Sequence, residues 1–429
     1  MSTSSEGPLR KAGWAYWSSV LGPGLITGAS DDDPSGISTY SVAGASAGLS
    51  MLWIVLVTTP MMAVIQGMCS RIGMVTGVGL ATNMRKHLPA WMLYPLSLSV
   101  IVANIINAGA DLEGMGSSAR LVTSLPEWFW VIVFGVVLVV LQVFFSYRAL
   151  FNVVKWLTLS LFAYIITAFI VHPHWGDVLK HLVTPELHFN AAWLTTLMAV
   201  LGTTITPYLF FWQACLMVEE EKSIGRNTAL SRRGATEQEI KDSHIDCNVG
   251  MIFSNIVAFF IIVTTAATLA ASGHSNIQTA QDAALALRPL AGRFAYLLFS
   301  LGMVGTGLLA IPALVASSAY VAAETLQWKH GLSLNLQKAP GFYGTLIVGM
   351  IVAVAMDFLH VNVISALLWS AVINGIVAVP LLAVIVWFAG SKKLMSKWRS
   401  SLLARIWGWA TVAVMGVAAI SIFVFWGKS

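Results

Sequence analysis

Charged residues are scarce in this sequence: they make up 10% of its 429 residues, against about a quarter in a typical soluble domain. Apolar residues make up 57%, and the mean hydropathy is +0.78. A chain this apolar cannot cover its surface with polar groups, so the composition excludes a soluble globular protein and predicts that lipid surrounds the fold. The net charge of +5 is small and indicates membrane orientation, not a nucleic-acid partner.

Cysteine is also scarce, with only Cys69, Cys215 and Cys247 in the chain. Their odd number and wide spacing match neither a disulfide framework nor a zinc site. No nucleophile with a partnered base stands out, so we expect neither an enzyme nor a bound cofactor. Residues 1–13 are polar and short, and the apolar segment after them is too long for a cleavable signal, so we expect no signal peptide.

Apolar segments of about the length that a bilayer requires, near 20 residues, recur along the chain. They fall at 19–44, 49–70, 91–118, 127–146, 151–171, 193–217, 248–272, 294–323, 341–358, 361–389 and 402–426. This pattern predicts an all-α membrane protein with about eleven transmembrane helices in a single domain, 1–429.

Lysine and arginine fall mostly on one side of this predicted topology. With the N-terminus in the cytoplasm, nineteen of the 24 lie in cytoplasmic segments. Because positive charge is retained on the cytoplasmic side, we expect a multi-pass protein of the bacterial inner membrane with a cytoplasmic N-terminus. The lipid bilayer is then an expected partner, and nothing indicates an obligatory protein partner.

Two apolar segments are interrupted by polar residues around a proline. The first, 19–44, contains three consecutive aspartates followed by Pro34, and the sixth, 193–217, contains Thr206-Pro207. Since they are five segments apart, they cross the membrane in opposite directions. Interrupted helices in corresponding, inverted positions predict the midplane substrate site of a transporter.

Proline at these breaks removes a backbone donor, so Pro34 would free the carbonyl of Ser30 and Pro207 that of Thr203. Asp33 adds a negative charge and Thr206 a hydroxyl oxygen. All these candidate ligands are oxygens, which suits a hard divalent cation. A simple kink remains an alternative explanation for the second proline.

The aspartates Asp31, Asp32 and Asp33 are difficult to explain by structure alone. A charge near the bilayer centre costs at least ~2.5–3.5 kcal/mol, so it persists there when it is paired, hydrated or functional. We therefore expect at least one of them to act in the site. Asp31 and Asp32 have another interpretation, in which they line a water-filled mouth or cap the second half-helix.

The third segment, 91–118, carries further polar residues. Asn104, Asn107 and Asp111 share one helical face, while Glu113 lies about 200° from Asp111 around the helix. We predict that Asp111 and Glu113 form an acidic vestibule or a proton route. The alternative is a stripe of polar residues buried against neighbouring helices.

Together these motifs resemble the Nramp family of divalent-metal transporters over nearly the whole chain. The similar segments are Gly22-Pro23-Gly24 with Asp33-Pro34-Ser35-Gly36 in helix 1, Gln66 to Gly77 in helix 2, and Asp111-Leu112 in helix 3. The resemblance implies the leucine-transporter-type fold of two inverted five-helix repeats, here about 19–171 and 193–389, with an extra helix at 402–426 and with helices 1 and 6 broken.

The departures from the family pattern concern the ligands. In helix 6, the family's Met-Pro-His-Asn motif aligns with Thr206-Pro207-Tyr208-Leu209, and the family's second histidine aligns with Gln213. In helix 1, the family's asparagine aligns with Gly36. In helix 3, the family's second acid aligns with Gly114, and the acid of this chain, Glu113, lies one position earlier. This pattern is similar to the magnesium-transporting branch. That resemblance implies a wider site for hydrated magnesium or manganese and no proton coupling, with Tyr208 and Gln213 beside the ion.

The chemistry of the residues favours the same interpretation. Thr206 in place of a thioether removes a soft ligand, Gly36 makes room, and magnesium keeps several of its waters. No histidine lies at the middle of a segment to titrate near neutral pH. We therefore expect facilitated uptake of magnesium, and also manganese, by alternating access.

Three alternatives remain open at this point. One is a proton-coupled manganese or iron transporter, which metal-driven acidification of vesicles would identify. Another is an organic-solute transporter of the same fold, although the aspartates 31–33 would repel a carboxylate substrate. The last is a membrane sensor that does not transport.

Overall fold

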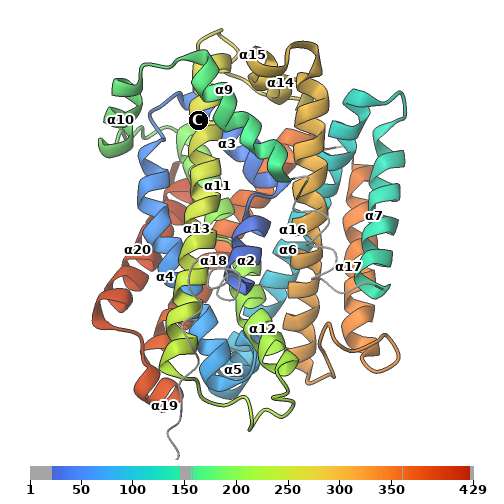
Figure 1. Ribbon diagram of the computed structural model, residues 1–429, viewed down its shortest axis with the longest axis vertical. Coiled ribbons are helices and arrows are strands. Elements are labelled where there is room, and N and C mark those ends of the chain that lie inside the picture. Colours follow the sequence, from blue (N-terminus) through green and yellow to red (C-terminus); the bar gives the residue numbers. More distant parts are fainter. Residues whose placement is uncertain (1–21, 145–155, 157, 360, 426–429) are drawn as a thin grey trace, which may run out of the picture.

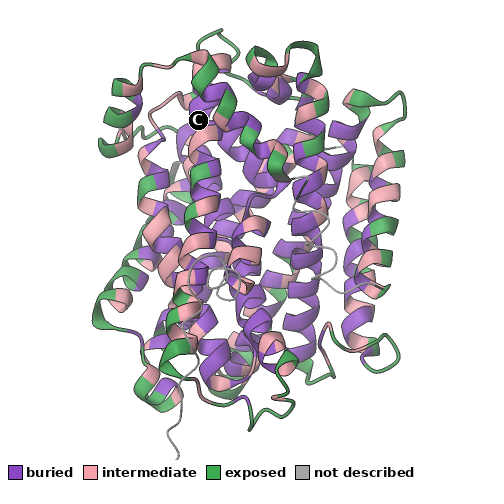
Figure 2. Ribbon diagram, in the orientation of Figure 1, coloured by how far each residue is buried: buried purple, intermediate pink, exposed green. Residues whose placement is uncertain are grey.

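The computed structural model describes residues 22–144, 156, 158–359 and 361–425, and this part of the chain is helical and contains no strand. The long helices run roughly along one axis, and short helices lie at both ends of the bundle (Figure 1). Buried residues are concentrated in the central helices, whereas helix α7 at the side carries more exposed residues (Figure 2). The core of the bundle is therefore where the broken helices lie.

Nine helical segments of the described chain are long and apolar enough to cross a membrane. They contain α4 (Trp53–Thr76), α6 (Ala90–Val122), α7 (Glu127–Phe144), α11 (Ala191–Thr204) with α12 (Pro207–Ser223), α13 (Glu237–Thr265), α16 (Ala295–Leu326), α17 (Pro340–Met356), α18 (Val363–Gly390) and α20 (Leu402–Phe425). These are nine of the eleven predicted segments.

The first and fifth predicted segments complete the set. The first consists of two short helices, α2 (Pro23–Asp31) and α3 (Pro34–Ala47). The fifth contains η1 (Thr158–Leu161) and α9 (Phe162–Val171), and its predicted start at 151 lies outside the described residues. The predicted ends at 19, 146 and 426 lie outside them too. The all-α fold with about eleven spans and a broken first and sixth helix is confirmed.

Short helices connect the spans. They are α5 (Leu80–His87), α10 (Trp175–Val183), α14 (Ala280–Ala284), α15 (Arg288–Ala291) and α19 (Lys392–Met395), with the π-helical turn η2 (Ala266–Ala270) and the 3₁₀ turns η3 (Leu285–Leu287), η4 (Gly292–Phe294), η5 (Asp357–Leu359) and η6 (Ser396–Trp398).

The break between α2 and α3 follows from its sequence. Pro34 occupies the first turn of α3, where a missing backbone donor is tolerated. Asp33 has extended backbone geometry, with φ −75° and ψ 171°, and its carboxylate accepts the backbone N–H of Gly36 as an N-cap. The second break repeats this arrangement, because α11 ends at Thr204 and α12 begins at Pro207.

Helix α2 packs on α13 with almost no side chain between them. A Cβ atom added at Gly28 would lie 2.3 Å from the carbonyl oxygen of Gly250, and one added at Gly24 would lie 2.5 Å from the backbone nitrogen of Cys247. Only glycine fits such an approach, which small residues permit between membrane helices.

The N-terminus of α2 is capped by a residue far away in sequence. The Asp246 carboxylate on α13 accepts the backbone N–H groups of Gly22 at 2.9 Å, Gly24 at 2.5 Å and Leu25 at 3.0 Å. These are donors that a helix start leaves unsatisfied, and the negative charge also suits the positive end of the helix dipole. Asp246 thus holds this half-helix in place.

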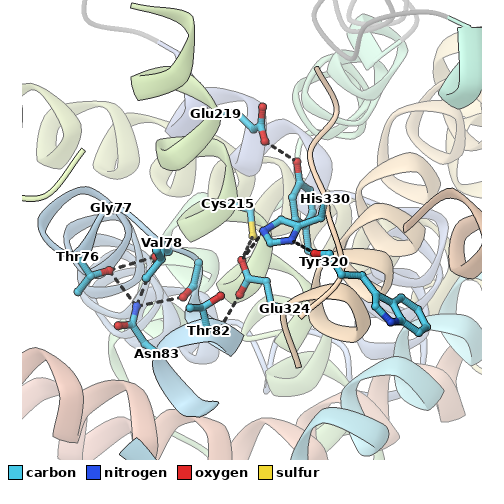
Figure 3. Close-up of polar contacts among 12 residues, drawn as sticks. Thr76, Gly77, Val78, Thr82, Asn83, Cys215, Glu219, Tyr320, Glu324 and His330 are labelled. Carbon is cyan, nitrogen blue, oxygen red and sulfur yellow. Dashed lines mark hydrogen bonds and ion pairs between the residues drawn. The ribbon is translucent and has the colours of Figure 1, made fainter. Parts of the chain in front are cut away.

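A buried carboxylate also connects the middle of α12 to its neighbours. Glu324 on α16 accepts the backbone N–H of Thr82 at the start of α5 at 2.7 Å (Figure 3). Its other oxygen lies 3.7 Å from Nε2 of His330 and accepts a weak hydrogen bond from Cys215 of α12 at 3.8 Å. Helices α5 and α12 are thereby joined to α16.

Candidate functional site

The two helix breaks lie against each other inside the bundle. The hydroxyl of Ser35 lies 3.4 Å from that of Thr203, and the hydroxyl of Tyr40 lies 2.9 Å from that of Thr204. Both contacts join α3 to α11, from the first and sixth segments. The structure thus brings together the two interruptions from which the site was predicted.

Asp33 is the acidic residue at the centre of this junction, and it is 2% exposed. Its Oδ1 accepts the Ser35 hydroxyl and the Gly36 backbone N–H, both at 2.7 Å. Its Oδ2 accepts the side-chain amide of Asn107 on α6 at 3.0 Å. All three donors are neutral, so they orient the carboxylate without neutralising its charge.

Gly36 leaves a small space that oxygen atoms surround. A Cβ atom added there would lie 3.4 Å from Asp33 Oδ1, 3.4 Å from Thr203 Oγ1 and 3.5 Å from the carbonyl oxygen of Asp31. Three oxygens from three residues therefore converge on one point that carries no side chain. This is the environment that a hard cation or its bound water prefers.

Thr206 provides a further oxygen at the second break. It is the N-cap residue of α12, yet its side chain does not cap the helix. Its hydroxyl oxygen is buried and has no hydrogen-bond partner in the described chain. A buried polar atom without a partner indicates that something else satisfies it, such as water or an ion.

The carbonyl of Ser30, predicted to be free, already has a partner. The hydroxyl of Tyr208 on α12 donates a hydrogen bond to this carbonyl at 2.5 Å, and both residues are buried. Pro34 does withhold the helical donor, but the sixth segment supplies another. The freedom expected from the sequence is therefore corrected, because the two breaks are close enough for one to satisfy the other.

Asp31 and Asp32 face a different helix. The hydroxyl of Ser254 on α13 donates to both carboxylates, at 3.1 Å for Asp32. Both aspartates are buried, and the cap of α3 is Asp33. Neither Asp31 nor Asp32 therefore caps the second half-helix, and their predicted place at a water-filled mouth stays a prediction.

The polar face of α6 points at the first break, as its spacing predicts. Asn107 contacts Asp33, and Asp111 Oδ1 accepts the backbone N–H of Ser35 at 3.0 Å. The remaining oxygens, Asn107 Oδ1 and Asp111 Oδ2, are buried and unpartnered within the described residues. Asn104, on the same face, is also buried, and neither atom of its amide has a partner there.

Glu113 does not join Asp111. Helix α6 runs without a break through both residues, so Glu113 points elsewhere and lies in the electrostatic field of Asp357 and Glu127. It is buried, and Glu127 also borders a cavity of about 600 Å³ with Ser117 and Arg120. The two acids therefore lie on different faces of α6, as the helix period indicates, and their role as an acidic vestibule or a proton route stays a prediction.

Gln213 lies further along α12 and is fully buried. Among the described residues, neither its amide oxygen nor its amide nitrogen has a hydrogen-bond partner. Its predicted place beside the ion pathway stays a prediction. Tyr40 at the junction and Ser254 beside Asp31 and Asp32 were not predicted, since a lone serine or tyrosine in an apolar helix carries no sequence signal. Ser35 and Asn107 stood inside recognised motifs.

No group of three or more His, Cys, Asp and Glu side chains is arranged to hold a metal ion anywhere in residues 22–144, 158–359 and 361–425. An ion at the junction would meet one carboxylate, Asp33, and otherwise hydroxyl, amide and carbonyl oxygens. Such a set suits an ion that keeps part of its water shell, not one held by several charged ligands.

The comparisons with known proteins extend over the same helices. A family model described as Nramp, "Natural resistance-associated macrophage protein-like", matches residues 24–425. Two relatives are named divalent metal cation transporter MntH. The protein of Brucella suis is 26% identical, and the match covers 68% of this chain and 63% of that protein. The protein of Yersinia enterocolitica is 25% identical, and the match covers 92% of each chain.

Solved structures show the fold. A manganese transporter of Eremococcus coleocola superposes with a TM-score of 0.78 at 16% identity, over 96% of this chain and 88% of that one. MhsT in complex with L-phenylalanine gives 0.58 at 12% identity, over 94% and 98%. Mhp1, a nucleobase-cation-symport-1 transporter, gives 0.53 at 15% identity, over 94% and 91%. The leucine-transporter-type fold is confirmed.

Proposed function

The chain belongs to the Nramp family, and on that basis we propose that it is a secondary transporter of hard divalent cations, magnesium and also manganese, across the membrane by alternating access. The observation that supports this best is Asp33, a buried carboxylate with only neutral donors at the junction of two broken helices. The names of its relatives support divalent metal ions as the substrate class.

Charge balance supports a cationic substrate. Asp31, Asp32, Asp33 and Asp111 are all buried, and none of them takes part in an ion pair among the described residues. Leaving carboxylates in low dielectric without a counter-charge costs several kcal/mol per ion. Protons or a divalent cation must offset that charge, and the oxygens around Gly36 favour the cation.

Magnesium is the preferred substrate in this proposal because the junction lacks soft ligands. Thr206 stands at the position of a thioether, and an oxygen in its place gives no advantage to a transition metal. Buried oxygens of Thr206, Asn107 and Asp111 have no hydrogen-bond partner among the described residues, so they are acceptors that suit the waters of a hydrated ion.

The orientation and the location belong to the same proposal. We place the protein in the bacterial inner membrane with its N-terminus in the cytoplasm, supported by the distribution of lysine and arginine. The N-terminal residues themselves lie outside the described residues. No cofactor, nucleic acid or obligatory protein partner is part of the proposal.

The test is uptake into liposomes that contain the purified full-length protein. Magnesium and manganese influx are measured with a simultaneous readout of internal pH. Asp33→Ala should reduce influx of both ions at least about tenfold, equivalent to ~1.4 kcal/mol. Asp242→Ala, on α13 with Gln238 as its partner, serves as a matched control that should leave influx unchanged. Undiminished influx in Asp33→Ala would contradict the proposal.

One observation favours a second candidate. Asp111 contacts the first break and keeps one carboxylate oxygen without a partner among the described residues, so it is placed to carry a proton. This supports proton-coupled transport of manganese or iron. Internal acidification that accompanies metal influx, and that Asp111→Asn removes, would establish this alternative.

A further inference from the structure

The carbonyl oxygen at the end of α2 has an unusual partner. In an unbroken helix the Ser30 carbonyl would accept the backbone N–H of the residue four positions later, but that residue is Pro34, which has none. The structure instead places the phenol hydroxyl of Tyr208 on this carbonyl at 2.5 Å. The oxygen that the helix break would offer to an ion is therefore engaged by a side chain from the other break.

The phenol is held firmly in this position. Tyr208 lies in the first turn of α12, directly after Pro207, and its side chain is fully buried. Its backbone carbonyl accepts the hydroxyl of Ser317 on α16 at 3.1 Å. Because the backbone is fixed at both the proline and this hydrogen bond, the phenol hydroxyl cannot leave the Ser30 carbonyl by a small local movement.

We propose that Tyr208 determines ion selectivity by occupying the Ser30 carbonyl, so that the transported ion must keep the water ligand that this carbonyl would replace. The inference rests on the proposed function, since it concerns the same junction. An ion that binds this carbonyl directly must compete with the phenol for it, and displacing the phenol leaves a buried hydroxyl without its acceptor.

The discrimination follows from the chemistry of hydration. Magnesium gives up its waters reluctantly, so a site that leaves the water shell intact suits it. Manganese exchanges its waters for protein oxygens more readily than magnesium does. It therefore loses more binding free energy when a protein ligand is not available. The occupied carbonyl thus disfavours manganese, and specificity arises here because binding of the competing ion is made less favourable.

Tyr208→Phe is the direct test, because it removes the hydroxyl and preserves the ring. Influx into liposomes is measured for magnesium and manganese separately, and the ratio of their kcat/KM values is compared with that of the unmodified protein. We expect the ratio to shift towards manganese by about tenfold, equivalent to ~1.4 kcal/mol. An unchanged ratio would overturn the inference.

Tyr320→Phe is the matched control. Tyr320 is also a buried tyrosine, and its hydroxyl donates to Glu219 at 3.0 Å, away from the helix breaks (Figure 3). This variant should keep the unmodified magnesium-to-manganese ratio. A shift of equal size in Tyr320→Phe would also overturn the inference, since it would reflect a general loss of buried hydroxyls.

Ser317→Ala gives a second variant in case Tyr208→Phe does not fold. It releases the backbone from which the phenol projects, so it should shift the ratio in the same direction by a smaller factor, and no shift counts against the inference. The proposed function is tested separately and is wrong if the unmodified protein transports neither ion. If the unmodified protein transports both ions and the variants leave the magnesium-to-manganese ratio unchanged, only the role of Tyr208 is wrong.

Discussion

Gly36 lies where its missing side chain leaves room between oxygen atoms of Asp33, Thr203 and Asp31. In a helix, alanine is more favourable than glycine by about 1 kcal/mol, so the presence of glycine in the first turn of α3 is not explained by helix stability. The space itself is the feature that a substitution can test.

Gly36→Ala should raise the KM for magnesium about tenfold, equivalent to ~1.4 kcal/mol, because the methyl group would fill the point on which the oxygens converge. The measurement is concentration-dependent influx into liposomes. Gly67→Ala on α4 is the control, since no described atom outside its own helix lies within 4 Å of a Cβ added there. Equal KM values for the two variants would show that the space has no role.

Ser254→Ala tests the pair of buried aspartates on the other side of the break. Asp31 and Asp32 share the Ser254 hydroxyl as a donor, and removing it leaves both carboxylates less satisfied. The loss of stability should be about 1–3 kcal/mol, seen as a lower melting temperature in detergent. Ser421→Ala is the control, because that hydroxyl donates only within α20, to Ala418. A melting temperature equal to that of the control would contradict this role.

At the residue scale, the sequence revealed the residues that carry their own signal. Asp33, Gly36 and Thr206 stand beside prolines in apolar segments, so their place at a helix break could be predicted. The partner of the Ser30 carbonyl could not, because it depends on how far α12 approaches α2. Likewise, no sequence spacing connects Asp31 with Ser254, which lies 223 positions away.

At the scale of the elements, α2 depends on a neighbouring helix for its start. Nine residues are too few to form a stable isolated helix, so tertiary contacts must supply its stability. Asp246 does so by accepting three backbone N–H groups at the N-terminus. The same carboxylate therefore controls how readily this half-helix moves.

Asp246→Ala should loosen the first turn of α2 and raise the hydrogen-exchange rates of the backbone amides at 22–25 by about tenfold, since loss of an N-cap costs about 1 kcal/mol or more. Mass spectrometry of peptides from this region measures the exchange. Asp242→Ala, one turn away on α13, should leave these rates unchanged. The role of Asp246 as a cap is wrong if both variants exchange alike.

The sequence predicts where the helices break, but it does not predict which residues of other helices pack around the breaks. Proline and the aspartates marked where α2 and α3 separate, and a helix period placed Asn107 and Asp111 on one face. The same period places Glu113 on another face of the helix. Helix α6 is continuous from Ala90 to Val122, so this placement of Glu113 holds in the structure.

At the scale of the whole molecule, the lengths of the apolar segments sufficed to predict the helical bundle. The first predicted segment is divided between Asp31 and Pro34, so neither α2 nor α3 alone is long enough to cross a membrane. The assignment of residues 19–171 and 193–389 to two inverted repeats stays a prediction for this chain. The sequence does not predict which distant helices pack together, because a hydrophobic pattern shows that a helix face is buried but not which helix covers it.

Transport by the whole molecule should respond to the membrane potential. Moving a divalent ion inward is favoured by roughly twice the ~2.3 kcal/mol that one charge gains per 100 mV. A potassium gradient with valinomycin, inside negative, should therefore accelerate magnesium influx into liposomes, and the reversed gradient should slow it. Influx that follows an imposed pH gradient and ignores the potential would contradict uncoupled transport.

The glycine contact between α2 and α13 has a mechanical consequence. Since Gly28 touches Gly250 through backbone atoms alone, no flexible side chain can absorb sliding between the two helices. One turn further along α13, Ser254 holds Asp31 and Asp32. If α2 tilts during a transport cycle, we expect α13 to travel with it. These two acidic groups would then keep their shared donor at every stage, and their desolvation would add no barrier of its own to the motion.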